Sequence, residues 1–451
     1  MRKLWIQLRS SLWFIPTLLV LAAVALAIGL IELDLALGDS LGWGKLRPFL
    51  GSSAEGARGM LTAIASSMIT VAGVAFSITI VTLSLASTQY TPRILRNFMR
   101  DCGNQSVLGV FVGTHVYCLI VLRTIRAEQG GMPGFVPLLA VFCGILLALL
   151  SIGCLIFFIH HVAASIQASF ILDAITKETL AAIDRLYPLT LQAAAEPEKA
   201  ATELPPGARH PLGAAATGYL QHVDREALLE LAIEHDLTLR MERVAGDFVV
   251  ENAPLVSATR ALDADAVAKV RAQFVIGDFR TVEQDAGFGI RQIVDIAMKA
   301  LSPGVNDTST AVSCLDYLSA ILSRLTGRSL DTPAGDKRAE QHRVITPAAL
   351  FADYFAKSLD EIRLSASGNV TILLQMLCLI TRVAAVTRDS QRTRVLIAHA
   401  RIIAELADHS VRAPYDRRRI NGELCTVRDV LNASDELPPL AVTQSDAPLT
   451  S

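Results

Sequence analysis

The apolar positions of the chain are concentrated in four long runs within the first 160 residues. The runs cover about residues 12–31, 60–86, 105–122 and 136–159, and none of them contains Asp, Glu, Lys or Arg. A helix needs about 20 apolar residues to cross the ~30 Å hydrocarbon core of a bilayer. The pattern therefore predicts a four-span transmembrane domain over residues 1–160.

The second run differs from the others because it is rich in small and hydroxylated residues. Several of these residues are spaced by 3, 4 or 7 positions, which places them in a stripe along one side of a helix. Two interpretations are open: the stripe lines an aqueous pathway, or its small side chains allow tight helix packing. The stripe consists of Ser66, Thr70, Gly73, Ser77, Ser84 and Thr88.

After the fourth run the pattern becomes that of a water-soluble domain. We expect a helix leaving the membrane over residues 161–187, and then a Pro- and Ala-rich linker over 188–217. Short alternating runs predict a small β-rich module over 218–260, and helical spacing dominates 261–432. The Pro- and Ser-rich tail, 433–451, is expected to be disordered. The predicted fold class is an α-helical membrane domain of four transmembrane helices plus a cytoplasmic α+β domain.

One helical segment of the soluble part is apolar enough to resemble a fifth span. It lies around VTILLQMLCLITRVAAV, and its uncharged stretch is short and includes Ser, Asn, Gln and Thr. Spans are longer and more uniformly apolar. We therefore expect a buried helix of the soluble domain.

The composition agrees with a chain that lies in two solvents. Of its 451 residues 52% are hydrophobic and 19% are charged, whereas soluble domains contain about 25% charged residues. Residues 1–160 contain 11 Lys and Arg against 6 Asp and Glu, a net charge of +5, and the remainder carries −7. Binding to nucleic acid needs a basic patch, so no nucleic-acid partner is expected. The seven cysteines have no CxxC spacing, so no metal site is expected either.

Basic residues beside the first two runs predict the orientation in the membrane. Three precede the first run and three follow the second, and positively charged flanks favour the cytoplasmic side. An even number of spans then places both the N-terminus and the C-terminus in the cytoplasm. The six residues are Arg2, Lys3, Arg9, Arg93, Arg96 and Arg100.

The most distinctive part of the soluble domain is residues 274–318, where polar residues gather at the expected starts of two helices. They form either a ligand or subunit site built on free N–H groups, or a set of helix caps and surface pairs. Both interpretations are open. The residues are Arg280, Thr281, Gln284, Asp285, Arg291, Asn306 and Asp307.

Motifs of the common enzyme classes are missing from the sequence. The soluble part contains no phosphate loop, GxSxG, HExxH or dinucleotide-binding glycine pattern. We therefore expect no enzymatic activity and no cofactor.

Several motifs together resemble a bacterial family of predicted membrane proteins that is defined by a domain of unknown function. They are ASSMITVAGVAFSIT, QYTPR, FIHH and ALSPGVND, with RTVEQD upstream of the last. The resemblance extends from about residue 5 to 410. It departs from the family pattern at Thr308, where a proline commonly follows Asn-Asp. The resemblance implies a four-span, multi-pass protein of the bacterial inner (plasma) membrane, and it implies no activity.

Two functional hypotheses follow from these patterns. In the first, the protein is an oligomeric channel-like protein whose second spans line a pathway and whose cytoplasmic domain regulates it. In the second, it is a membrane-anchored sensor or scaffold whose cytoplasmic domain binds a ligand or partner. The expected partners are the lipid bilayer and further copies of the same chain in a homo-oligomer.

Overall fold

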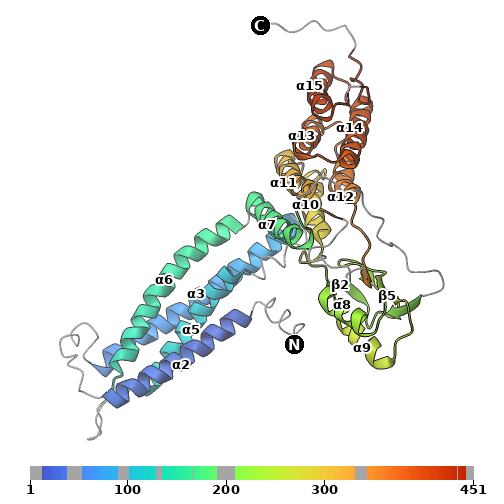
Figure 1. The fold of residues 1–451 in the computed structure, drawn as a ribbon. Coiled ribbons are helices and arrows are strands. Elements are labelled where there is room, and N and C mark those ends of the chain that lie inside the picture. Colours follow the sequence, from blue (N-terminus) through green and yellow to red (C-terminus); the bar gives the residue numbers. More distant parts are fainter. Residues whose placement is uncertain are drawn as a thin grey trace, which may run out of the picture. The chain divides into compact units, whose positions relative to one another are not determined.

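The computed structural model describes eight stretches of the chain, which form two compact units (Figure 1). The first unit comprises residues 1–170 and the second residues 171–451, and each is described by itself. The described stretches are 13–37, 53–89, 101–127, 135–165, 167–189, 209–330, 343–433 and 435–442.

Four long helices that lie alongside one another make up the first unit (Figure 1). Within the described residues, these four are long and apolar enough to cross a membrane. They confirm the four transmembrane helices expected from the sequence. The helices are α2 (Phe14–Leu37), α3 (Ala54–Gln89), α5 (Cys102–Thr124) and α6 (Leu138–Ser165).

Helix α5 is the central helix of the first unit, because it packs against α2, α3 and α6. Its contact with α2 is close: a Cβ on Gly109 would lie 2.6 Å from Leu19 Cδ1. Polar groups tie α5 to its other neighbours. His115 Nδ1 lies 2.9 Å from the Ala65 carbonyl oxygen of α3, and the Tyr117 hydroxyl donates to the Ala140 carbonyl of α6 at 2.7 Å.

Helix α2 extends beyond the first apolar run, which ended at residue 31, and its last turns include Asp34. The Asp34 carboxylate accepts hydrogen bonds from the amides of Leu139 and Ala140, both at 3.2 Å. These amides belong to the first turn of α6, where no intrahelical acceptor is available. Asp34, which lies just beyond the predicted apolar run, thus caps the first turn of the neighbouring helix α6.

The helix predicted over residues 161–187 is two helices. Residues 161–165 belong to α6, which ends at Ser165, and α7 (Ala168–Leu186) begins as a separate helix. Helical apolar spacing continues across the break, so the sequence pattern alone did not indicate it.

Two small sheets open the soluble part of the second unit. In the four-stranded sheet β1 (His210–Gly213), β5 (Pro254–Ala258) and β3 (Leu239–Met241) are antiparallel, and β7 (Val344–Ile345) runs parallel to β3. In the other, β4 (Phe248–Val249) and β6 (Phe274–Gly277) flank β2 (Gly218–Val223). The sheets share one core with α8 (Arg225–Glu234) and α9 (Ala264–Ala272).

This β-rich module is larger than the predicted residues 218–260. Strand β1 lies in the segment predicted as a linker, and β6 and β7 follow residue 260. These strands have two to four residues each, too few for alternation to reveal them. Residues 190–208 of the predicted linker lie outside the described part of the chain.

Helices complete the second unit. Helix α10 packs against α11 and α12, and α13 packs against α11, α14 and α15. Helix α13 is the apolar segment that the sequence assigned to the soluble core, and most of its apolar side chains are fully buried. The helices are α10 (Ala286–Ala300), α11 (Thr308–Thr326), α12 (Phe351–Ser365), α13 (Val370–Val386), α14 (Ser390–Ser410) and α15 (Pro414–Leu431).

The beginning of the predicted disordered tail is folded. Leu437 and Leu440 are buried, and Asn421 exchanges two hydrogen bonds with the backbone of Leu440. These contacts hold residues 435–442 against the end of the helical part. Residues 443–451 lie outside the described part of the chain.

Candidate functional site

The predicted stripe of α3 faces away from the other helices of its own unit. Ser66, Thr70, Gly73, Ser77 and Ser84 are all exposed, and a Cβ on Gly73 would meet nothing within 4 Å. The side of α3 that packs inside the unit consists of other residues. They are Leu61, Ala65, Met68, Ala72, Ala75 and Thr82.

The stripe hydroxyls donate to their own helix. Ser66, Thr70 and Ser77 each bond the carbonyl four residues earlier, at 2.8–2.9 Å. A hydroxyl that donates inward keeps its oxygen lone pairs as acceptors. At these three positions the stripe therefore presents acceptor oxygens on an apolar helix. Thr88 lies in the last turn of α3, and its side chain is outside the described residues.

Large apolar side chains border the stripe on both sides. Ile69 and Phe76 lie along one edge and Val74 and Val81 along the other, and all four are exposed. Packing against helices of the same unit therefore does not explain the stripe. Its small residues remain available for contact with lipid, water or another protein surface.

In the second unit, Arg280 and Asp285 form an ion pair at the start of α10. Arg280 donates through Nε and Nη2 to Asp285 Oδ2, at 3.0 and 2.6 Å, and its guanidinium lies 5.1 Å from the centre of the Phe288 ring. The other oxygen, Asp285 Oδ1, accepts from the Phe288 amide and caps α10. Burial raises the pKa of Asp285, and the charge and hydrogen bonds of Arg280 offset that effect only in part.

Gln284 and Thr281 attach the same segment to strand β2. The Gln284 side-chain amide accepts from the Val223 amide at 2.9 Å and donates to the Val223 carbonyl at 3.1 Å. Thr281 donates to the Gln221 carbonyl at 3.4 Å. The two side chains therefore bond the backbone of the β-rich module.

Arg291, Asn306 and Asp307 lie apart from this ion pair. Arg291 projects from the middle of α10 and pairs with Asp295 at 2.7 Å and with Glu361 of α12. Asn306 and Asp307 follow the other end of α10, whose 15 residues span about 22 Å. The structure therefore does not gather the seven residues into one pocket, and the contacts favour the interpretation as caps and pairs.

Asp307 is the N-cap of α11. Its Oδ1 accepts from the Thr310 amide at 3.0 Å and its Oδ2 from the Thr310 hydroxyl at 2.5 Å, and the hydroxyl bond lowers the pKa of Asp307. Asn306 precedes it in a left-handed conformation, with φ of 49°.

We expect Asp307→Ala to lower the stability of the second unit by about 1 kcal/mol. Because the pKa of Asp307 is lowered on folding, its contribution is present above the unfolded value of about 3.9 and is lost as the pH falls. Hydrogen exchange of the Thr310 amide measures the change. Asp307→Asn is the control, since it keeps a capping oxygen and removes the pH dependence. Equal hydrogen-exchange protection of the Thr310 amide in Asp307→Ala and Asp307→Asn would contradict the assignment of Asp307 as the N-cap.

The sequence did not reveal the residues that hold α7 in the second unit. Asp184 pairs with Arg324 at 2.6 Å and with Arg328, and the hydrogen bond from Arg324 lowers the pKa of Asp184. Arg328 also donates to the Tyr187 carbonyl at 3.0 Å, and the Tyr187 hydroxyl lies 2.7 Å from that of Tyr354. The partners are 140 to 167 residues apart in sequence, so no local pattern signals them.

Comparison with known proteins assigns the chain to a family. Residues 9–382 match the family described as "Predicted membrane protein (DUF2254)". The chain belongs to this family. The chain is also similar to two uncharacterised mycobacterial proteins, Mb1321c of Mycobacterium bovis and Rv1290c of Mycobacterium tuberculosis H37Rv. Each is 33% identical over 438 residues, which are 96% of this chain and 83% of the relative. No solved structure matches the chain.

Membership of DUF2254 confirms the resemblance inferred from the motifs and, with the four apolar helices, a membrane protein. A bacterial inner membrane fits both findings, and the orientation of the termini stays a prediction. Among the described residues, no group of three or more His, Cys, Asp or Glu side chains is placed to hold a metal ion.

Proposed function

We propose that the protein is an oligomeric, channel-like membrane protein in which α3 of each copy lines a narrow pathway. The observation that carries the proposal is the position of the stripe. Its small and hydroxylated residues lie on the exposed side of α3, opposite the side that packs against α5 and α6. Placing this side against other copies removes polar oxygens from lipid and allows close approach between helices.

The chemistry of the stripe favours water or a cation over an anion. Ser66, Thr70 and Ser77 offer oxygen acceptors, because their hydroxyl protons are bonded to the helix backbone. The predicted span, residues 60–86, also lacks Asp, Glu, Lys and Arg. Ion-coupled transporters use such groups as relays, so a passive pathway fits these residues better.

The attachment of α7 supports a regulatory role for the soluble domain. Helix α7 follows α6 after only two residues, and Asp184 near its end pairs with Arg324 and Arg328 of the second unit. A movement of the soluble domain is therefore transmitted to the fourth span through α7, which is joined to α6 in the sequence.

Ion flux through the purified protein in liposomes tests the proposal. We expect potassium flux well above that of empty liposomes and above chloride flux, and cross-linking of the reconstituted protein into oligomers. A monomeric protein, or flux equal to that of empty liposomes, would contradict it.

The alternative is a membrane-anchored sensor or scaffold, and the partly buried Arg280–Asp285 pair between the β-rich module and α10 is the feature that favours it. This hypothesis requires the second unit to fold and to bind a ligand or partner without the spans. The piece to test begins at Ile171 and ends near residue 442, because α7, β1 and residues 435–442 are part of its fold. Thermal shifts of this piece against metabolites and nucleotides, without flux by the full chain, favour the sensor.

A further inference from the structure

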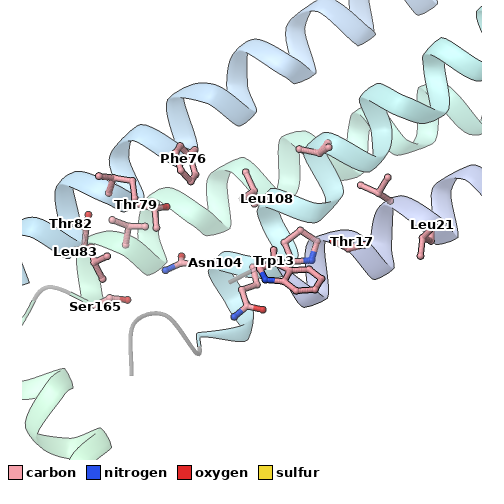
Figure 2. Close-up of a pocket in the computed structure, with 16 residues that line it drawn as sticks. Trp13, Thr17, Leu21, Phe76, Thr79, Thr82, Leu83, Asn104, Leu108 and Ser165 are labelled. Atoms are coloured by element: carbon pink, nitrogen blue, oxygen red, sulfur yellow. The ribbon is translucent and has the colours of Figure 1, made fainter. Parts of the chain in front are cut away.

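A cavity of about 370 Å³ lies within the first unit and is lined by α2, α3, α5 and α6. This volume is in the range of small-molecule sites, which is about 300–1,000 Å³. Helix α5 packs against both α2 and α3. Figure 2 shows Leu108 of α5 between the lining side chains of these two helices, such as Thr17 and Phe76.

The mouth of the cavity is framed by side chains that a surrounding bilayer would contact. Trp13, which directly precedes α2, Leu21 of α2, and Phe76 and Ile80 of α3 line the cavity and are also highly exposed. The deeper lining, including Leu108 and Val112, is mostly apolar as well. A cavity that opens sideways into lipid and is walled by hydrocarbon suits an alkyl chain.

The cavity has one polar end, at the beginning of α5. Asn104, Thr82 and Ser165 line it there (Figure 2) and are 8% exposed or less. In the part of the chain that the structure describes, Asn104 Oδ1 is buried and accepts no hydrogen bond. A buried acceptor without a donor is unfavourable, so an occupant with an N–H or O–H group gains a bond that the protein leaves unmade.

We propose that this cavity binds one acyl chain of a phospholipid from the surrounding bilayer, with a headgroup N–H donating to Asn104 Oδ1. Phosphatidylethanolamine has this combination of parts, a long alkyl chain and an ammonium donor. Phosphatidylcholine is the matched comparison, because its chains are the same and its quaternary ammonium has no N–H. None of the six stripe residues lines the cavity, and labelling of the cavity is read out separately from ion flux.

Photolabelling of the full-length protein tests the site. The protein is reconstituted with phosphatidylethanolamine or phosphatidylcholine bearing a diazirine on one acyl chain, and the labelled peptides are mapped by mass spectrometry. We expect adducts at Leu108 and Val112, about tenfold more from the ethanolamine lipid, since a bond to a charged donor is among the stronger hydrogen bonds. Excess unlabelled fatty acid is not expected to compete.

Three test variants and one control separate the acyl chain from the headgroup. Leu108→Trp fills the cavity from α5. Thr17→Trp fills it from the exposed side of α2 and does not disturb buried packing. We expect each variant to lower the photolabelling at least fivefold. Leu149→Trp, on the exposed side of α6 and outside the cavity, should leave it unchanged. Asn104→Leu should keep chain labelling and abolish the preference for ethanolamine.

Four results would overturn the proposal, three of which concern the labelling itself. These three are labelling spread evenly over lipid-facing residues, labelling unchanged by Thr17→Trp, and equal labelling by the two lipids in the unmodified chain. Displacement by fatty acid alone would assign the cavity to a free amphiphile instead, and would also overturn it.

Discussion

A Gly246→Ala substitution is expected to lower the melting temperature of the second unit by roughly 6–12 °C, which corresponds to about 3 kcal/mol for a domain of this size. Gly246 has φ of 97°, where an L-residue is strained by about 1–2 kcal/mol. A Cβ there would also overlap Asp285 Oδ2 and would lie 2.6 Å from its Cγ and 3.2 Å from Arg280 Nη2.

The Asp285 carboxylate is not free to move away from that added carbon. Its Oδ1 accepts the Phe288 amide as the cap of α10, and its Oδ2 accepts both bonds from Arg280. Accommodating the methyl group therefore breaks a cap or an ion pair whose carboxylate is only 10% exposed. Breaking a buried pair leaves a charge without compensation.

Gly368→Ala is the matched control, because Gly368 also has a positive φ, of 75°, but the nearest atom to its added Cβ is 3.9 Å away. Only the backbone strain applies there, so we expect a shift of roughly 2–6 °C. Thermal unfolding of the full-length protein in detergent, followed by hydrogen exchange of α10 and of α13, measures both variants. Equal shifts would show that the Arg280–Asp285 pair does not depend on the Gly246 turn.

Thr70→Trp and Ser77→Trp are each expected to reduce ion flux at least tenfold in the channel hypothesis. Both residues lie on the exposed stripe of α3, bordered by Phe76 and Val74. An indole at either position would fill a narrow pathway and remove an acceptor oxygen from its wall. Flux is measured in liposomes that contain equal amounts of each protein.

The matched control is Val81→Trp, since Val81 is exposed on α3 but belongs to the apolar border of the stripe. We expect a smaller loss there, and none for Leu149→Trp on the exposed side of α6. If Thr70→Trp and Ser77→Trp conducted like the unmodified chain, the stripe would have no role in permeation.

The membrane half of the fold was readable from the sequence because hydropathy depends on local composition. The ends of the four spans were located to within six residues. The first span ends later than predicted because Asp34 lies inside the last turns of α2, where it caps α6. Helix α13 was expected to be a buried helix because the uncharged stretch around it is short and includes Ser, Asn, Gln and Thr, and most of its apolar side chains are indeed buried. The two short strands β6 and β7 were missed because pairing partners far away in sequence decide them.

The candidate site was predictable only in part. The residues of the α3 stripe follow from helical spacing, whereas the side of α3 that packs inside the unit depends on α5 and α6. The polar residues between Arg280 and Asp307 were recognised, and their proximity in sequence suggested one cluster. In the structure, α10 lies between Asp285 and Asn306 and is about 22 Å long. Residues from four helices line the cavity beside Asn104, so no local sequence motif predicts it.

The most direct measurement on the proposed pathway is the reactivity of a thiol at Gly73. In a cysteine-free background, Gly73→Cys places a side chain in the middle of the predicted span, with nothing within 4 Å in its own unit. A charged, water-soluble thiol reagent should modify this residue and block flux if α3 lines an aqueous pathway. Leu149→Cys, on the exposed side of α6, should not react. A Gly73→Cys thiol as unreactive as that control would contradict the proposed channel.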